Sequence, residues 1–393
     1  MAKNKGGFIG HFGLEAPDPP TGVSASAGDT QATISFTAPS DVGGDPITGF
    51  RAQSNDGIGA SGSSSPITVT GLTNGTSYTF NVWAINDYGY SSPSDASGSV
   101  TPNVLQRALF GGGYNYNTID FVDITSAGNA TDFGDMVSSS MRLGAAASKT
   151  RAIWFGGGDP SGSSNVISYV TIATTGDAVD FGDLLTNEEE MMPFSNNTRG
   201  LAAGDSSASS AVIQYVTIAS TGNSADFGDM SPNTQRGAGT ANSTRGLICG
   251  GIPFGAYTNQ IQYVTISSLG NGTDFGDMTL VRGRHAALAS STRAVNCGGE
   301  ATSSALTNVM DYVTISSTGN ASDFGDLTSA ARYCGATSGL TKGVIALGRD
   351  SSDDVNTIDQ ITIATTANST DFGDLSVTRR ATGAASSAHG GTQ

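Results

Sequence analysis

The sequence contains few of the residues on which catalysis or metal binding usually depends. Charged residues make up 13% of its 393 residues, and there are only 3 histidines and 3 cysteines. Cys249, Cys297 and Cys334 are odd in number and lack the paired spacing of zinc ligands, so we expect neither a disulfide framework nor a cysteine metal site. Cys249 and Cys297 each precede two glycines in an apolar segment, which predicts small buried side chains.

Positive charge is also scarce. The chain has 18 Lys and Arg against 34 Asp and Glu, a formal net charge of −16. Since non-specific binding of nucleic acid depends on neutralising phosphates with basic side chains, this composition argues against a nucleic-acid partner. Much of the acidic excess lies in a repeated four-residue phrase described below, so it does not by itself indicate a cationic partner.

Long apolar stretches are absent as well. No segment is long and apolar enough to cross a bilayer as a helix, so membrane insertion is not expected. The N-terminal segment MAKNKGGFIGHFGLEAPDPP has no continuous apolar region of the kind found in secretory signals. The sequence therefore predicts synthesis and folding in a cytoplasm, which leaves later release open.

Glycine and short β-branched runs are abundant instead. There are 54 glycines, and runs of Val, Ile, Thr and Tyr are bounded by Gly, Asn, Asp and Ser, which is typical of an all-β protein with many tight turns. The phrase Asp-Phe-Gly-Asp occurs six times, beginning at Asp132, Asp180, Asp226, Asp274, Asp323 and Asp371, in steps of 48, 46, 48, 49 and 48 residues. A period near fifty indicates a repeat architecture.

The repeated phrase resembles the magnesium-binding motif of protein kinases, but a kinase has one copy, accompanied by a glycine-rich loop and a catalytic segment that this chain lacks. We interpret its phenylalanine as a buried wedge between repeats, with the glycine permitting a bulge and the aspartates accepting backbone hydrogen bonds. The six residues are Phe133, Phe181, Phe227, Phe275, Phe324 and Phe372. No further carboxylate recurs with the phrase, so we expect no metal, although calcium binding stays open.

Residues 18–102 contain no copy of the phrase and form a separate predicted domain. Alternating apolar and polar residues predict several strands here, and the phrase LTNGTSYTFNVWAIN resembles the fibronectin type III domain. The resemblance implies a tyrosine corner made by Leu72 and Tyr78, with the Tyr78 hydroxyl bonded back to the backbone. Phe36 stands where this family usually has a tryptophan.

Residues 104–393 hold the six repeats. Each contains a segment of small residues, an apolar strand, an alternating strand and the repeated phrase, an order that resembles the kelch repeat. In that family the first strand lines a central channel. The region begins with a second segment at Gln106 and ends with a first segment at Arg380, so the last strand is expected to complete the first repeat. The predicted fold is all-β: a fibronectin type III β-sandwich followed by a six-bladed kelch-like β-propeller closed by the C-terminal strand.

Arginine recurs at the start of two segments of the repeats. Glu190 begins the first segment of one repeat, and arginine begins it in the other five: Arg142, Arg236, Arg284, Arg332 and Arg380. The second segments begin with Gln106, Arg151, Arg199, Arg245, Arg293 and Lys342. We expect the arginines to pair with the repeated aspartates between repeats. The alternative is that they bind an anionic glycan in the channel mouth.

No catalytic constellation is recognisable in the sequence, so we predict a protein without enzymatic activity or cofactor. Copper enzymes of the kelch class that resemble galactose oxidase need histidine ligands, but His11, His285 and His389 lie in unrelated parts of the sequence. The Ser-x-Asp-x-Gly-x-Thr-Trp boxes of sialidase propellers are missing, as is a Ser-His-Asp or paired-glutamate set.

Residues 1–17 form a glycine-rich leader that carries Phe8, Ile9 and Phe12 without a core of its own. A flexible tail and an anchor peptide that orders on another protein both fit this composition. The leader KGGFIGHFGLEAPDPPTG, the fibronectin phrase and repeats such as YVTIASTGNSADFGDM together resemble the fibronectin and kelch proteins encoded by contractile-tailed phages of marine cyanobacteria. The resemblance implies a location in the virion, attachment to other virion proteins through the leader, and no catalytic residues.

Two functions are compatible with this resemblance. One is a tail-fibre-like adhesin that binds a host-surface glycan or protein, and the other is a structural decoration of tail, baseplate or capsid without a receptor. The loops after the glycine pairs vary, whereas the turn before the repeated phrase barely changes, which favours the adhesin. Side chains suited to contact a sugar occur in two of these loops: Tyr114, Asn115, Tyr116, Phe254, Tyr257 and Asn259. The sequence does not indicate an oligomeric state.

Overall fold

The computed structural model describes residues 14–159, 161–204 and 211–393. The chain divides into two compact units, Met1–Leu105 and Gln106–Gln393. Across the described ranges the protein is all-β and has no α-helix, as the composition predicts. Its helical segments there are three short 3₁₀ turns, η1 (Pro253–Gly255), η2 (Thr302–Ser304) and η3 (Gly390–Thr392).

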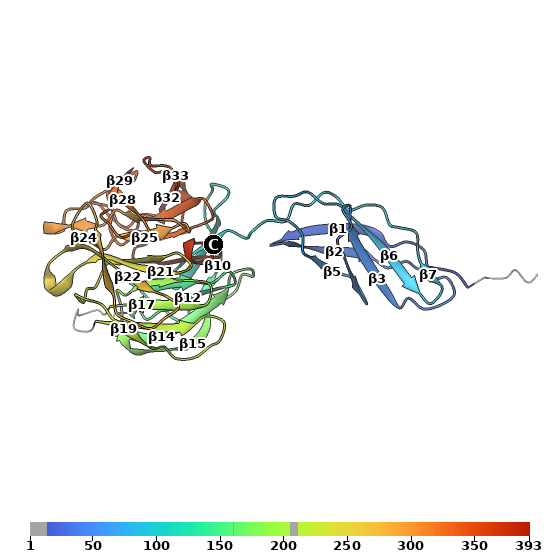
Figure 1. Ribbon diagram of the computed structural model, residues 1–393, viewed down its shortest axis with the longest axis horizontal. Helices are drawn as coiled ribbons and strands as arrows, with labels where there is room; N and C mark the ends of the chain where they lie inside the picture. The colour runs from blue at the N-terminus through green and yellow to red at the C-terminus, as the bar shows by residue number, and fades with distance from the viewer. Residues whose placement is uncertain (1–13, 160, 205–210) are drawn as a thin grey trace, which may run out of the picture. The chain divides into compact units, whose positions relative to one another are not determined.

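The first unit consists of two antiparallel sheets that share one core (Figure 1). One sheet has the order β1 (Thr21–Gly28), β2 (Gln31–Thr37), β5 (Ile67–Thr70), and the other β4 (Gly59–Gly62), β3 (Gly49–Ser54), β6 (Phe80–Asn86), β7 (Gly89–Tyr90). Every second side chain of β2 and β6 is buried, because successive residues of a strand point to opposite faces. The core joins Phe36 of one sheet to Phe50 of the other, with ring centroids 4.9 Å apart.

A tyrosine hydroxyl fixes the entry into β6. Tyr78 is buried, and its hydroxyl accepts a hydrogen bond from the backbone N–H of Thr73 at 3.0 Å. Leu72 is buried in the same core, and its own N–H donates to the carbonyl of Thr30 at 3.0 Å. This arrangement is the tyrosine corner that the fibronectin phrase predicts.

Residues 14–17 are bonded to this first unit. The N–H of Glu15 donates to the carbonyl of Gly43 at 3.0 Å, and the side-chain amide of Asn86 donates to the carbonyl of Glu15 at 2.8 Å. The last residues of the expected leader are therefore bonded to the sandwich. The predicted anchor residues Phe8, Ile9 and Phe12 lie outside the described residues.

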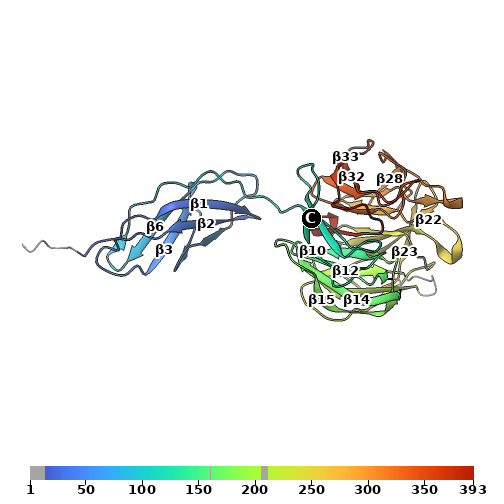
Figure 2. The same cartoon turned by 180° about the vertical axis from the view of Figure 1, so that it is seen from behind.

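In its described residues the second unit contains six large antiparallel sheets, which we number in chain order, and one two-stranded sheet (Figure 2). From first to fourth strand, sheet 1 is β34 (Gly383–Ser386), β8 (Arg107–Gly111), β9 (Thr118–Asp123), β10 (Thr131–Asp135); sheet 2 is β11 (Gly144–Ala147), β12 (Arg151–Phe155), β14 (Gly162–Thr171), β15 (Val179–Glu188); and sheet 3 is β16 (Met192–Ser195), β17 (Arg199–Ala203), β18 (Val212–Thr217), β19 (Ala225–Asp229). Sheet 4 is β20 (Ala238–Ala241), β21 (Arg245–Gly251), β22 (Thr258–Thr265), β23 (Thr273–Asp277); sheet 5 is β25 (Ala286–Ala289), β26 (Arg293–Cys297), β28 (Val309–Thr314), β29 (Ser322–Asp326); and sheet 6 is β30 (Gly335–Ser338), β31 (Lys342–Ala346), β32 (Thr357–Thr362), β33 (Thr370–Asp374). In addition β13 (Gly158–Asp159) pairs with β14, and β24 (Arg282–Gly283) pairs with β27 (Glu300–Ala301).

Sheet 1 combines strands from both ends of the unit. Gly383 of β34 pairs with Gly111 of β8, and Ser386 pairs with Ala108, in an antiparallel register. The first strands of consecutive sheets also contact one another, and β34 contacts both β11 and β30. Each first strand therefore lies against the first strands of two other sheets.

Six buried clusters join neighbouring sheets, and a phenylalanine of the repeated phrase lies in each. Phe181 of sheet 2 belongs to a cluster with Val216 of sheet 3, and Phe372 of sheet 6 belongs to one with Val122 of sheet 1. In sheets 1 to 5 the ring also meets an aromatic side chain of the third strand edge-on, with centroids 5.7–6.1 Å apart. The six phenylalanines thus lie at the junctions between sheets.

The end of the repeated phrase is bonded to the turn of the following repeat, a contact that we call the turn latch. The backbone N–H of the second aspartate donates to a side-chain oxygen in that turn at 3.0–3.1 Å. The pairs are Asp135–Asp177, Asp183–Asn223, Asp229–Asn271, Asp277–Asn320, Asp326–Asn368 and Asp374–Asn129. The expectation that the aspartates accept backbone hydrogen bonds is confirmed for Asp226, whose Oδ1 accepts from the N–H of Gly228 at 3.1 Å, whereas in the latch the second aspartate donates through its backbone N–H.

The glycine of the phrase is required by this close approach. Gly228 has φ of +148°, and a Cβ placed on it would lie 2.4 Å from the carbonyl oxygen of Gly270 in the next turn. Any larger residue would collide with that backbone and adopt a strained conformation. The constancy of the phrase and of the turn before it is therefore explained by packing between sheets.

Candidate functional site

The loops that join second to third strands lie beside the starts of the first strands. In sheet 2 the first residue of β11, Gly144, pairs with the last residue of β12, Phe155. An isolated bridge continues this pairing between Met141 and Gly158, where the loop begins. We call this end of the second unit the mouth: the residues just before the first strands together with the loops after the second strands.

Six backbone amides of the mouth form a cyclic set of hydrogen bonds, which we call the amide ring. Its members lie two positions before the first strands and have φ between 53° and 60°: Arg142, Glu190, Arg236, Arg284, Tyr333 and Ala381. From Glu190 onward, each N–H donates to the carbonyl oxygen of the preceding member. The N–H of Arg142 donates to the carbonyl oxygen of Ala381, which closes the ring, and all six bonds are 2.5–3.3 Å long. Left-handed conformations of non-glycine residues are unfavourable and persist where surrounding bonds enforce them, as these do.

The amide ring corrects the register of the predicted arginine set. Arg142 lies two residues before the first strand of its sheet, but Arg332 and Arg380 lie three residues before theirs. The equivalent positions in sheets 6 and 1 are occupied by Tyr333 and Ala381. Arginine is thus a ring member in three sheets, and the other two predicted arginines stand one position outside the ring.

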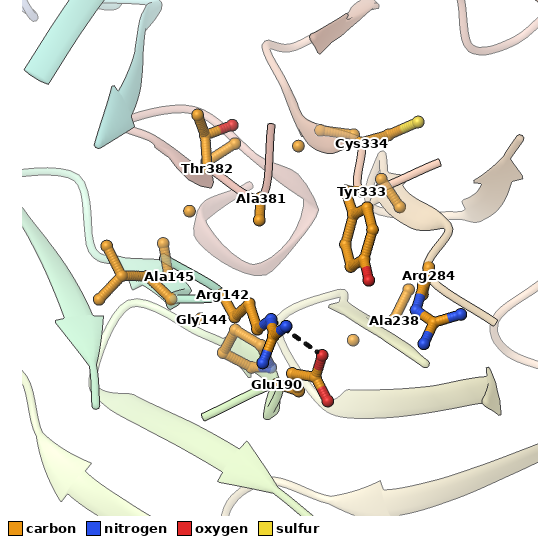
Figure 3. A pocket seen from close by; sticks show the side chains of 18 of the residues that line it. Arg142, Gly144, Ala145, Glu190, Ala238, Arg284, Tyr333, Cys334, Ala381 and Thr382 are labelled. Carbon is orange, nitrogen blue, oxygen red and sulfur yellow. Dashed lines mark ion pairs between the residues drawn. The ribbon is translucent and has the colours of Figure 1, made fainter. Parts of the chain in front are cut away.

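The residues that follow the amide ring line a cavity of about 130 Å³. Its walls are mostly small side chains such as Ala145 and Ala238, which allow the first strands to approach closely. Figure 3 shows Arg142, Glu190 and Tyr333 at this cavity, with the ion pair between the first two drawn as a dashed line. Charged and aromatic side chains therefore line this cavity together with small ones.

A neighbouring recess of about 280 Å³ shares three lining residues with this cavity. We call it the arginine recess, and it is lined by Tyr114, Met141, Arg142, Arg332, Tyr333, Arg349, Arg380 and Ala381. The guanidinium carbon of Arg380 lies 4.3 Å from the ring centroid of Tyr114, and that of Arg332 lies 5.6 Å from the ring of Tyr333. Cation–π contacts of this kind hold both partners in place.

Three carboxylates each bridge two arginines of the mouth. Glu190 bridges Arg142 and Arg236, Glu300 bridges Arg284 and Arg332, and Asp354 bridges Arg349 and Arg380. Glu189 and Asp353 add one pair each, with Arg142 and Arg349. This network of ion pairs contains six arginines and five carboxylates, a formal charge of 6 − 5 = +1.

Burial and neighbouring charges act in opposite directions on these groups. Burial of Glu300 raises the pKa of its carboxyl group, but hydrogen bonds from Tyr257 and Arg332 and the charge of Arg284 outweigh this and hold the pKa below its ordinary value. Burial of Arg142 lowers the pKa of its guanidinium, but the nearby glutamates leave that pKa raised overall. Glu300 and Arg142 are therefore both ionised at neutral pH.

The prediction that these arginines pair with the repeated aspartates is wrong. In the described part of the chain, the ion pairs of Arg142, Arg236, Arg284, Arg332 and Arg380 go to the mouth carboxylates. The reason is topological: the arginines precede the first strand of a sheet, whereas the repeated phrase forms the fourth strand on the other side.

The second set of arginines has a structural role elsewhere. Each guanidinium lies 4.2–4.9 Å from the centroid of an aromatic ring on the third strand, and its Nη1 donates to an isoleucine carbonyl of the next repeat at 2.7–3.0 Å. The residues are Arg107, Arg151, Arg199, Arg245 and Arg293. These contacts tie neighbouring sheets together.

The predicted receptor-binding residues lie in different environments. Tyr114 and Asn115 are exposed and Tyr116 is partly buried, all in the loop between β8 and β9. The Tyr257 hydroxyl donates to Oε1 of Glu300 at 2.5 Å, so it belongs to the network of charges in the mouth. Asn259 is not in a loop: it lies in β22, and its amide donates to the carbonyl of Met278 at 3.3 Å.

Phe254, the remaining predicted residue, lies in η1, and its side chain is outside the described part of the structure. Sequence reasoning missed Glu300, Asp354 and Arg349, which stand in loops that do not repeat. The sequence contains one indication of two of these residues: Glu300 and Arg349 each directly follow the glycine that ends a second segment.

The end opposite the mouth is occupied by the segment after β34. There η3 contacts β16, β20 and β25, and Nε2 of His389 lies 2.9 Å from the carbonyl of Ala147. Burial lowers the pKa of His389, so its ring is neutral at pH 7. The first strands are therefore covered at this end and accessible from the mouth.

Within the described ranges, no group of three or more His, Cys, Asp or Glu side chains is placed to hold a metal ion. Within the same ranges, no helix is both long enough and apolar enough to span a bilayer.

Comparison with known proteins identifies one part of the chain. The family model of the fibronectin type III domain matches residues 18–99. A solved structure of titin domains A168–A170 is 29% identical over 22% of this chain and 32% of that chain, with a TM-score of 0.22. The chain thus covers about a third of the titin structure. Residues 18–99, with their paired sheets and tyrosine corner, are a fibronectin type III domain.

Proposed function

We propose that Gln106–Gln393 form a six-bladed kelch-like β-propeller in which β34 completes the first blade. Three independent sets of contacts support this closure: the amide ring, the buried clusters around the repeated phenylalanines, and the turn latches. Each set has six members, and in each set one member joins sheet 6 to sheet 1. An open arrangement would break one member of every set and leave a strand edge unpaired.

We propose further that the protein is a non-enzymatic phage virion appendage, tail-associated or fibre-like, which binds the host surface. The resemblance of the leader, fibronectin phrase and repeats to cyanophage proteins supports the location. The leader, with Phe8, Ile9 and Phe12, would attach the chain to other virion proteins. The fibronectin type III domain fits the role of a spacer between attachment and the repeat unit.

The observation that carries the binding function is the composition of the mouth. Its loops differ from one another, bring arginines and tyrosines together, and surround a cavity and a recess. Exposed Tyr114 and Asn115 add an aromatic face and an amide suited to a saccharide. Variable loops on a rigid scaffold are a common arrangement for recognition.

A structural decoration without a receptor is the second candidate function. The observation that favours it is the pairing within the mouth, where Tyr257 and three carboxylates already satisfy much of the arginine network. In that case the network would stabilise the propeller and bind nothing.

Binding to intact cells of marine cyanobacteria distinguishes the two functions. Purified, fluorescently labelled protein is incubated with a panel of strains and the bound fraction is measured by flow cytometry. The test variant carries Gly-Ser linkers in place of residues 114–116 and 253–257. A matched control carries a Gly-Ser linker in place of Ala173–Thr175, an exposed turn at the opposite end from the mouth, and both variants must melt at the wild-type temperature.

An adhesin that uses these loops binds at least one strain as wild type and as control, and loses that binding in the test variant. Equal binding by all three proteins would place the receptor surface elsewhere. If the wild type binds no strain of the panel, the decoration function is supported instead.

A further inference from the structure

The arginine recess gathers positive charge from three sheets. Arg142 precedes the first strand of sheet 2, Arg332 and Arg349 belong to sheet 6, and Arg380 precedes β34 of sheet 1. Among the described residues, the lining contains these four arginines and two tyrosines, and the bridging carboxylates are not part of it. An entering ligand therefore meets guanidinium groups rather than their partners.

The arginines keep donors that their ion pairs do not use. Within the described part of the chain, Arg332, Arg349 and Arg380 reach their carboxylates through Nη1. A guanidinium has five N–H donors in one plane. The Nε of Arg332 is buried and has no hydrogen-bond partner among the described residues.

Size and shape restrict what can enter. A volume of about 280 Å³ lies just below the range of roughly 300–1,000 Å³ that holds drug-sized molecules, so the recess accommodates one small group and not an extended chain. The two tyrosines supply aromatic faces, on which the apolar face of a sugar ring can pack. Peptides, in contrast, are usually bound along sheet edges or in elongated grooves.

We propose that the arginine recess binds a single carboxylate or sulfate group of an acidic saccharide. This inference rests on the proposed host-surface function and specifies its ligand chemistry. Charge-assisted hydrogen bonds from planar guanidinium groups fit both anions, because each presents several oxygens in a fixed geometry. Tyr114, held by its contact with Arg380, contacts the sugar ring that carries the anion.

The test measures binding of defined saccharides by isothermal titration calorimetry on the full chain. The probes are oligosaccharides of galacturonic acid, a sulfated galactan oligosaccharide, a neutral galactan oligosaccharide and a peptide of Asp and Glu. The wild type is expected to bind at least one acidic saccharide about tenfold or more tightly than the neutral one, and more weakly as salt is added. The two acidic saccharides decide between carboxylate and sulfate.

Arg349→Gln combined with Arg380→Gln is the informative variant, with an expected loss of about tenfold or more in affinity. Lys149→Gln combined with Arg51→Gln changes the formal charge equally at positions outside the recess and should bind as wild type does. Arg380→Lys keeps the charge but loses the planar donor set, so its affinity should fall between the two, and it also covers the case in which the double variant does not fold.

Several outcomes would overturn the inference: equal affinity for neutral and acidic saccharides, unchanged affinity of the double variant, tighter binding of the acidic peptide, or no binding of any probe. The cell-binding experiment shows whether only the acidic-saccharide inference is wrong or the proposed host-surface function as well. Cells bound through the mouth loops without acidic saccharide binding would leave the adhesin intact. Acidic saccharide binding without cell binding would leave the recess assignment intact.

Discussion

In the second unit, the connections at the two ends of the sheets differ in how much their sequences vary between repeats. Because neighbouring strands are antiparallel, the turns that form the latches lie at the opposite end from the mouth loops. The latch turns are nearly identical in all repeats and bond to the backbone of the preceding sheet. The mouth loops differ in length and bond largely to one another. The sequence of a turn that packs against the backbone of a neighbouring sheet cannot vary. The sequence of a loop that makes no such contact can.

Removing β34 should have the largest effect on this arrangement. Deletion of residues 383–393 exposes the edge of β8 and removes the pairing from Gly383 to Ser386. We expect aggregation or a large drop in melting temperature by differential scanning calorimetry. Deletion of residues 387–393 alone keeps the strand but removes the packing of η3, so the difference between the two deletions measures the contribution of β34. Equal melting temperatures for wild type and the longer deletion would disprove closure.

The junction between sheets should be nearly as sensitive. Phe227 is 2% exposed and belongs to a cluster that spans sheets 3 and 4, so Phe227→Ala should cost about 3–5 kcal/mol in unfolding free energy. Tyr88→Ala, at a site that is 53% exposed in the first unit, should cost little. Urea unfolding of both variants measures the difference. A clear loss of melting temperature with EDTA, together with a mild effect of Phe227→Ala, would instead indicate a metal at the repeated phrase.

The latch offers a comparison between two glycines. Gly228→Ala places a Cβ 2.4 Å from a backbone oxygen at positive φ and should cost about 1–3 kcal/mol. Gly270→Ala, in the turn that receives this contact, meets no atom within 4 Å and should be almost neutral. Comparable costs for the two substitutions in urea unfolding would contradict the steric explanation of the constant phrase.

The mouth contains one group whose contribution should depend on pH. Glu300 has a lowered pKa, so its ionised form stabilises the folded state above the ordinary glutamate pKa of about 4.3, and that stabilisation is lost as pH falls through the lowered value. Glu300→Gln should therefore cost about 1–2 kcal/mol at neutral pH. The cost should shrink in acid unfolding below about pH 4. A difference that is constant across this range would mean that the charge of Glu300 is unimportant.

Exposed loop residues of the mouth should have the smallest effect on stability. Tyr114 is 39% exposed, and Tyr114→Ala should change the unfolding free energy by no more than about 0.5 kcal/mol. The same substitution should weaken saccharide binding. A stability loss as large as that of Phe227→Ala would show that the mouth loops stabilise the fold as much as the junctions between sheets do.

The repeats and the first domain could be predicted from the sequence, because both depend on regular spacing of particular residues along the chain. The regular steps between copies of the repeated phrase reveal the repeats, and the phrase around Tyr78 reveals the fibronectin type III domain. The junction position of residues such as Phe227 follows from the burial of a repeated aromatic side chain.

The mouth could be predicted only in part, because its contacts join segments that share no pattern. Arg332 lies three residues before Gly335, whereas Arg142 lies two before Gly144, and this single-residue shift moves Arg332 out of the amide ring. Glu300 is one of several loop acids, and only the fold brings it between two arginines. Asn259 resembles a loop residue in sequence, but its amide is used within the sheet.

Hydrogen–deuterium exchange of the intact protein, read by mass spectrometry, tests the contrast between the two ends most directly. The account predicts slow exchange at the latch amides in all six repeats, including Asp374, whose N–H reaches Asn129 across the closing junction. It predicts faster exchange than at the latches in the mouth loops at residues 114–116 and 350–353, because their amides bond mostly within their own loops, as Tyr116 does to Gly113 and Asp350 to Asp353. Fast exchange at Asp374 with slow exchange at the other latches would mean that the unit is open, and protection of the loops equal to that of the latches would contradict the division between fold and function.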